Sequence, residues 1–221
     1  MLRKVMGLLA CTAVLGLAVV ATAGVPDLSL STATAPGLTA QATLNNRPDG
    51  AGDDFTQAQL QSVPTVPPTL VDATITLTLL DGNSDPVKFF PSEDMYLGTT
   101  STDFFSCVNG TVADFVTNEF GVTEWQDPME AGGWTDPTVP DVTQVFINGA
   151  PLQGAGFDLQ FNSADLDGLG GADGAVDITD IVTFTQIYYG AYQYRADFIW
   201  DTTIDISDIV VMAQSNGANC P

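Results

Sequence analysis

The chain has 221 residues, enough for one large domain or two small ones. It carries 27 acidic residues against 5 basic ones and has no histidine, so its formal net charge is −22. Such a polyanion repels phosphate, which excludes nucleic acid as a partner. The missing histidine excludes Ser-His-Asp hydrolases and HExxH metalloproteases. All but 4 of the acids are aspartate, and short carboxylates are typical of calcium-binding loops.

The N-terminus has the pattern of a secretory signal peptide. Two basic residues, Arg3 and Lys4, precede an almost wholly apolar run over residues 5–20, and an A-x-A cleavage motif ends at Ala23. We therefore predict a signal peptide over residues 1–23 and a secreted protein, extracellular or on the cell surface. The alternatives are a membrane anchor, for which a run of about 16 residues is short, and lipidation at Cys11. No other segment is long enough to span a membrane.

Two cysteines remain after the predicted cleavage, Cys107 and Cys220. An even pair in an exported protein indicates a disulfide. The alternative is two separate free thiols. A bridge would clamp the C-terminal end of the chain onto its middle.

Residues 24–70 are rich in Ala, Thr, Pro, Gly and Gln. Residues 28–31 alternate like a first strand, and residues 63–68 resemble a polyproline spacer. We expect an initial strand followed by a long surface excursion.

Residues 71–162 predict a β-sandwich. Residues 71–80 alternate apolar and polar side chains, as expected of a strand with one buried face. Short extended runs separated by turn residues follow at 95–99, 110–115, 122–125, 142–147 and 157–161. No helical period appears before residue 165, and this spacing of short strands is typical of a sandwich.

Two motifs in this region resemble a bacterial Ig-like domain of the invasin type. Residues 75–87, ITLTLLDGNSDPV, resemble the strand that opens this domain and its D-x-x-G/N-x-P-V turn. Residues 117–123, TNEFGVT, resemble the family's T-D-x-x-G-x-A turn and strand. The resemblance implies an Ig-like β-sandwich over residues 71–162.

A pattern of aspartates is duplicated in residues 163–221. The triplet D-x-x-x-D-x-x-D recurs 28 residues along the chain, each time followed by an apolar segment of helical type, 181–188 and 209–214. Solvation alone does not predict such a repeat. The two triplets are Asp173, Asp177, Asp180 and Asp201, Asp205, Asp208.

The repeats fit the twelve-residue frame of an EF-hand-like calcium loop, with ligands at alternate positions and a last acid at position 12. The second copy, loop two, fits without gaps, but Ile199 occupies position 3 and Thr202 occupies position 6, where a glycine is expected. The first copy, loop one, fits only if residues 169–172 loop out. The candidate calcium ligands are Asp165, Asp167, Asp173, Asp177 and Asp180 in loop one, and Asp197, Asp201, Asp205 and Asp208 in loop two.

Two such loops, each ending in aspartate and each followed by one helix, resemble a type I dockerin domain. The resemblance implies a small α-helical unit over residues 163–221, calcium-dependent folding, a cohesin-like partner, and a place in extracellular polysaccharide degradation. Typical dockerins carry Ser-Thr at loop positions 10 and 11, where this chain has Ile178-Thr179 and Ile206-Ser207. The four tyrosines between the repeats are expected to fill the seam between the loops.

Two functions remain open. The first is a secreted, non-catalytic, calcium-stabilised protein that mediates protein–protein attachment. The second is a structural or adhesive surface protein whose dockerin-like unit packs on its own Ig-like domain, and Ile178 and Ile206 favour it because apolar residues suit a permanent contact. An enzyme is disfavoured by the small size and the missing histidine.

Overall fold

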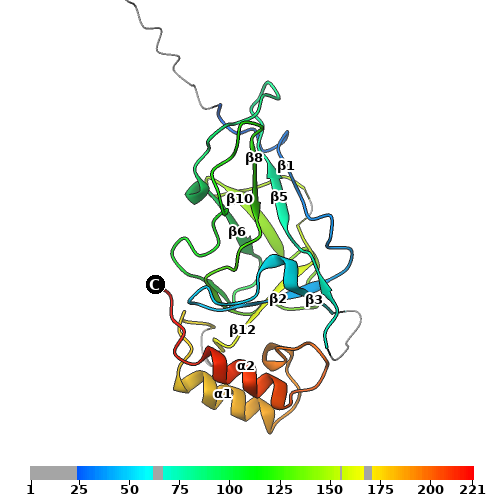
Figure 1. The fold of residues 1–221 in the computed structure, drawn as a ribbon, viewed down its shortest axis with the longest axis vertical. Helices are drawn as coiled ribbons and strands as arrows, with labels where there is room; N and C mark the ends of the chain where they lie inside the picture. The colour runs from blue at the N-terminus through cyan, green and yellow to red at the C-terminus, as the bar shows by residue number, and fades with distance from the viewer. Residues whose placement is uncertain (1–23, 62–66, 155, 167–170) are drawn as a thin grey trace, which may run out of the picture.

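The computed structural model describes residues 24–61, 67–154, 156–166 and 171–221. The predicted signal peptide and Asp167 lie outside these ranges. The protein is mostly β, with several small sheets in the upper part of Figure 1 and two helices at its lower end. In the described ranges, no helix is both long and apolar enough to cross a membrane.

The β part, which we call the β body, contains four small sheets. Their strand orders are β1-β5-β8, β11-β10-β6, β12-β2-β3-β4 and β7-β9. The strands are β1 (Thr32–Thr34), β2 (Ala42–Asn46), β3 (Ala58–Leu60), β4 (Leu70–Val71), β5 (Ile75–Thr78), β6 (Met95–Thr99), β7 (Phe104–Ser106), β8 (Val122–Trp125), β9 (Ala131–Gly133), β10 (Thr143–Ile147), β11 (Ala150–Pro151) and β12 (Leu159–Ser163). Short 3-10 turns lie at Phe55–Gln57, Ser92–Asp94 and Tyr194–Ala196.

The strand predicted at residues 71–80 is interrupted. It forms the end of β4 and all of β5, and the expected alternation holds where Ile75, Leu77 and Leu79 are buried. The strands predicted at 95–99, 122–125 and 142–147 correspond to β6, β8 and β10. Residues 110–115 form no named strand, although Val112 makes an isolated bridge with Tyr96.

The initial strand expected at residues 28–31 lies instead at β1 (Thr32–Thr34), and the surface excursion expected to follow it up to residue 70 is wrong for its central part. Strand β2 lies between β12 and β3, and pairs in parallel with β12. Ala42, Leu44 and Phe55 are completely buried in the main core, together with Phe161 and Trp125. The core contacts come from strands distant in the sequence, so the Ala- and Thr-rich composition of this segment does not reveal them.

The C-terminal unit contains α1 (Ile178–Tyr188) and α2 (Ile206–Ser215), which lie below β12 in Figure 1. Its small core includes Leu166, Phe184, Phe198 and Met212. Trp134, which follows β9, belongs to the same core, so the unit is packed directly on the β body.

Candidate metal centre

Each helix of the C-terminal unit begins at an aspartate of the repeat. The Asp177 carboxylate accepts from the Thr179 N–H, and Asp180 accepts from the Asp177 N–H at 2.7 Å, which makes a capping box. Asp205 and Asp208 make the same box at α2. Aspartate is favoured here because it satisfies backbone N–H groups that have no partner within the helix.

The aspartates at position 1 are buried hydrogen-bond acceptors. Asp165 accepts from the N–H groups of Asp173 and Gly174, at 3.2 and 2.9 Å. Asp197 accepts from those of Asp201 and Thr202, at 3.3 and 2.9 Å. Each carboxylate therefore binds the backbone at positions 5 and 6 of its own loop.

The aspartates at position 12 close the loops from the other side. The Asp180 carboxylate accepts from the Leu166 N–H and the Asp208 carboxylate from the Phe198 N–H, both at 2.6 Å. Leu166 and Phe198 both follow a position-1 aspartate, so the two loops have equivalent hydrogen bonds.

This equivalence fixes the register of the repeat. Asp165 matches Asp197, 32 residues further on, whereas Asp173 matches Asp201, 28 residues further on. Loop one therefore has four more residues than loop two between positions 1 and 5. The expected loop-out at 169–172 falls in this interval, most of which lies outside the described residues.

The remaining candidate ligands lie nearer the surface. Asp173 and Asp177 are exposed, and Asp201 and Asp205 are half-buried. Asp173 and Asp201 each accept from the N–H two residues further on, which makes the same short turn in both loops.

The buried carboxylates lack cationic partners. In the described ranges the one salt bridge joins Arg47 to Asp49, and the Arg195 guanidinium lies over the Trp134 ring. Burial raises the pKa of Asp165 to about 7 and that of Asp208 to about 6, and also raises the pKa values of Asp180 and Asp197. Neighbouring carboxylates add to each rise because like charges disfavour ionisation.

The donor chemistry of the loops fits calcium, which prefers oxygen ligands. A divalent cation would also offset the cost of burying four carboxylates with no basic partner. In the chain as described, however, no three carboxylate or thiol groups are already gathered as a metal site. The carboxylates at positions 1 and 12 bind backbone N–H groups instead.

Position 6 differs between the loops. Gly174 has φ +85° and Thr202 has φ 71°, both in the left-handed region. That region is strained for a β-branched residue. The EF-hand-like frame expects glycine at position 6. In both loops this position has the left-handed backbone that favours glycine, although loop two has threonine there.

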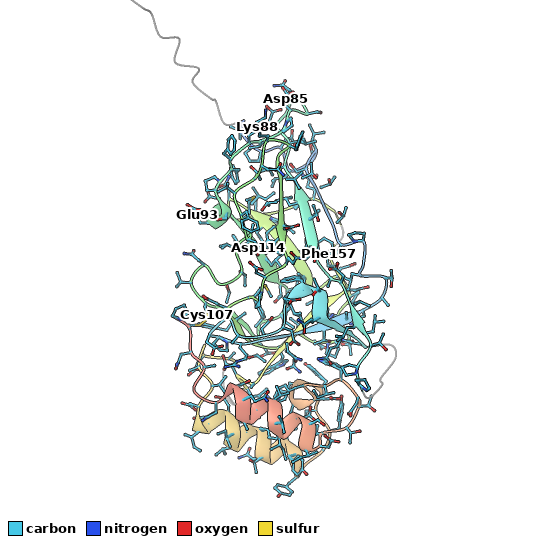
Figure 2. All side chains as sticks on the ribbon, viewed as in Figure 1. Asp85, Lys88, Glu93, Cys107, Asp114 and Phe157 are labelled. Atoms are coloured by element: carbon cyan, nitrogen blue, oxygen red, sulfur yellow. A yellow bond between two sulfur atoms is a disulfide. The ribbon has the colours of Figure 1, made fainter. Side chains whose placement is uncertain are left out.

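Loop one is attached to the β body through the C-terminal tail. Cys220 forms a disulfide with Cys107, which lies beside the tail at the lower left of Figure 2. The Cys220 N–H donates to the Gly174 carbonyl, and the Val176 N–H to the Ala218 carbonyl, both at 2.8 Å. Gly132 in β9 packs against the Asp165 carboxylate so closely that a Cβ there would collide with it.

Loop two is attached by two asparagines. Asn45 of β2 and Asn162 of β12 are partners in the parallel register. The Asn162 Nδ2 donates to the Asp197 carbonyl at 3.2 Å, and the Asn45 Nδ2 donates to the Phe198 carbonyl at 2.9 Å. Sequence reasoning missed both residues. In the sequence, each is marked only as a polar amide near the end of a strand, and this feature is too common to indicate an attachment site.

The outer faces of the helices remain exposed. Ile178 is 69% exposed and Ile206 is 66% exposed, so the expectation that they suit a contact within the chain is wrong. Val182 and Val210, one turn further on in each helix, are also exposed. The two helices thus present an equivalent pair of apolar residues.

The tyrosines between the repeats fill the seam only in part. Tyr194 packs against the core of the C-terminal unit, and the Tyr192 hydroxyl donates to Asp197 Oδ2 at 2.8 Å. Tyr189 is 83% exposed. Tyr192 was not predicted to bind a loop carboxylate.

Comparison with known proteins gives no relative. No family model, no curated protein and no solved structure matches this chain.

Proposed function

We propose that this chain is a secreted, non-catalytic attachment protein whose C-terminal, dockerin-like unit is stabilised by calcium and held on an Ig-like β body. The observation that carries the proposal is the duplicated burial of four carboxylates, two in each loop, without a basic partner in the described part of the chain. Burying unpaired charge is costly, and the same arrangement occurs twice.

Calcium would be held by the aspartates of each loop, and it would supply positive charge where the chain has none. In loop one the holders are Asp165, Asp173, Asp177 and Asp180, with Asp167. In loop two they are Asp197, Asp201, Asp205 and Asp208, while Ile199 offers no side-chain oxygen at position 3.

The attachment surface is the outer face of the two helices, which we call the helix face: Ile178, Val182, Ile206 and Val210. Its residues are exposed and apolar, and Asp177 and Asp205 lie immediately before it at the helix starts. A partner with an apolar centre and a basic rim would complement it. A cohesin-like protein in extracellular polysaccharide degradation is the partner that the resemblance implies.

The second candidate is a structural or adhesive surface protein whose dockerin-like unit recruits nothing. The disulfide and the asparagine pair favour it, because they hold the unit on its own β body. The exposed helix face favours attachment, because a unit that packed only within its chain would have no use for those apolar residues. A disulfide is in keeping with either role outside the cell.

Calorimetry on the chain without residues 1–23 tests the calcium component. We expect saturable calcium binding and a rise in melting temperature that a chelator reverses. Asp208→Ala should abolish one binding event, whereas Asp85→Ala should leave both. Asp85 lies on an exposed turn at the opposite end of the molecule (Figure 2). No heat and no thermal shift at millimolar calcium would refute this component.

A pull-down from the extracellular fraction of the source culture tests attachment. The double variant Ile178→Asp, Ile206→Asp should lose a calcium-dependent partner. Phe120→Asp, which places the same charge on an exposed aromatic position of the β body, should retain it. If all three forms capture nothing, the structural role is the better account.

A further inference from the structure

A second candidate site lies on the connection from α1 to α2 (orange in Figure 1), and no helix-face residue lines it. It is an open cavity of about 390 Å³ that we call the tyrosine cavity. Its lining consists of Tyr192, Gln193, Tyr194 and Arg195, with Trp134 of the β body. Tyr192 is 50% exposed and Gln193 is also exposed, so a ligand reaches both side chains from solvent.

The side chains of the tyrosine cavity are held in place by contacts with the rest of the protein. The Tyr192 hydroxyl donates to Asp197 Oδ2 at 2.8 Å. The Arg195 guanidinium lies 4.8 Å from the centre of the Trp134 ring, and its Nε donates to Gln193 Oε1 at 3.0 Å. A ligand therefore meets groups that are already ordered, and its binding costs less side-chain entropy.

The hydrogen-bond donors of the tyrosine cavity are accessible and unused. Among the described residues, Arg195 forms no salt bridge, and its two terminal nitrogens have no hydrogen-bond partner. These nitrogens are not buried. The Gln193 Nε2 is also without a partner in the described part of the chain, because only Gln193 Oε1 is used. The site thus offers several N–H groups to the oxygen atoms of a ligand.

The surrounding charges select a neutral ligand. A cation is repelled by the Arg195 guanidinium. An anion is disfavoured by the net charge of −22 and by two nearby carboxylates, those of Asp136 and Asp103. Burial and then these two carboxylates raise the pKa of Tyr194, which lines the cavity. The ligand that remains is uncharged and rich in oxygen acceptors.

The Tyr192 ring supplies the apolar part of the site. Its hydroxyl is fixed on Asp197, so the half-exposed ring is a rigid platform. A sugar ring has a C–H face that packs on one aromatic ring, and hydroxyl oxygens along its edge. A proline-rich peptide is also neutral, but it packs in a groove lined by several aromatic rings. Here Arg195 covers the Trp134 ring, which is 6% exposed, so a sugar fits the site better.

We propose that the tyrosine cavity binds a neutral sugar, with its C–H face on the Tyr192 ring and its hydroxyl oxygens accepting hydrogen bonds from Arg195 and Gln193. The cavity volume lies within the ~300–1,000 Å³ of small-molecule sites. This activity goes beyond calcium-stabilised attachment and does not use the helix face. It gives the protein a contact with glycans in addition to its contact with a partner protein.

Saturation-transfer NMR on the chain without residues 1–23, in calcium buffer, tests the proposal. The neutral probes are D-glucose, D-galactose, D-mannose and D-xylose, each titrated singly, and D-glucuronate is the anionic probe. We expect saturable binding of at least one neutral sugar in the millimolar range, because one ring contact and a few hydrogen bonds form a small interface. D-glucuronate should bind more weakly, because the surrounding carboxylates repel it.

Variants of the lining assign the signal to the tyrosine cavity. Arg195→Met keeps the cover over Trp134 but removes the donors, so it should weaken binding roughly tenfold. Tyr192→Ala should abolish binding, whereas Tyr192→Phe keeps the ring and should retain most of it. Tyr189→Ala is the matched control, since Tyr189 is an exposed tyrosine that does not line this cavity. Arg195→Met keeps the test decisive if Tyr192→Ala does not fold.

Three results would overturn the proposal. The first is no saturable signal for any of the four neutral sugars. The second is equal binding by the Arg195→Met, Tyr192→Ala and Tyr189→Ala proteins. The third is saturable binding of a proline-rich peptide, acetyl-hexaproline amide, by a protein that binds none of the sugars, which would assign the cavity to peptides. None of these results bears on the calcium titration.

Discussion

The two aspartate loops share one hydrogen-bonding scheme but are attached to the β body in different ways. In both, the position-1 carboxylate binds the backbone at positions 5 and 6, and the position-12 carboxylate closes the loop. Loop one is then secured by the disulfide-linked tail, whereas loop two is secured by Asn45 and Asn162. Local structure thus depends on the repeated residues, and attachment depends on residues outside the repeat.

The insertion supports the same distinction. Four additional residues in loop one leave the position-1, position-5 and position-12 bonds intact. The position-1 carboxylate holds the backbone on the far side of the insertion through its N–H bonds. A longer segment between these two points is tolerated, because both of its ends remain fixed. The comparison therefore predicts that the loops respond alike when a shared aspartate is removed and differently when an attachment is removed.

Removal of the disulfide should have the largest effect. Cys107→Ser with Cys220→Ser should lower the free energy of unfolding by about 2–5 kcal/mol, because the bridge closes a long loop of chain. Hydrogen exchange should accelerate at the amides of Val176 and of position 220, while the Thr202 amide stays protected. Asn162→Ala should instead accelerate exchange at the Thr202 amide and leave the Val176 amide protected. Equal acceleration in both loops would contradict separate attachment.

Loss of a position-12 aspartate should come next. Asp180→Ala and Asp208→Ala should each destabilise the protein by about 1–3 kcal/mol, because each leaves buried N–H groups without an acceptor and breaks a capping box. Chemical denaturation of the two variants, with Asp85→Ala as control, measures this. A large difference between the two would show that the shared bonds are not energetically equivalent.

A pH titration of stability in chelator tests the same buried carboxylates without removing an atom. Burial raises the pKa of Asp165 to about 7 and of Asp208 to about 6, from an ordinary value of 3.8. The folded state then binds more protons than the unfolded state between pH 4 and these values, so stability falls as pH rises through that window.

Two variants assign the pH effect to the loops. Asp165→Asn should remove the part nearest pH 7, and Asp208→Asn the part nearest pH 6. Melting temperature against pH, with and without calcium, measures both, and calcium should flatten the curve. Stability that rises with pH in chelator would contradict the pKa shifts.

The smallest effect concerns position 6. Thr202→Gly should stabilise the protein by about 0.5–1 kcal/mol, because relief of left-handed strain exceeds the entropy cost of glycine. Gly174→Ala should destabilise it, since a Cβ there would crowd Phe105 and the Cys220 sulfur. Thermal melts of both variants, with Thr203→Gly as control, test whether position 6 has the same requirement in both loops.

The sequence by itself predicted the features that depend on local pattern. The mostly β class, the buried face of β5 and the two helices after the repeats follow from periodicity over a few residues. The cysteine pairing followed from counting residues outside the predicted signal peptide, and the structure contains that disulfide. The calcium ligands remain a prediction.

The tertiary structure decided what depends on distant contacts. Burial of Leu44 required β12 to lie beside β2, although their paired residues are more than 100 positions apart. The exposure of Ile178 and Ile206 depended on which face of the C-terminal unit packs on the β body, and no local pattern specifies that face. The cavity lined by Asn45 and Gln59 of the β body and by Val211 of the C-terminal unit exists only where the two parts meet, so no local pattern predicts it.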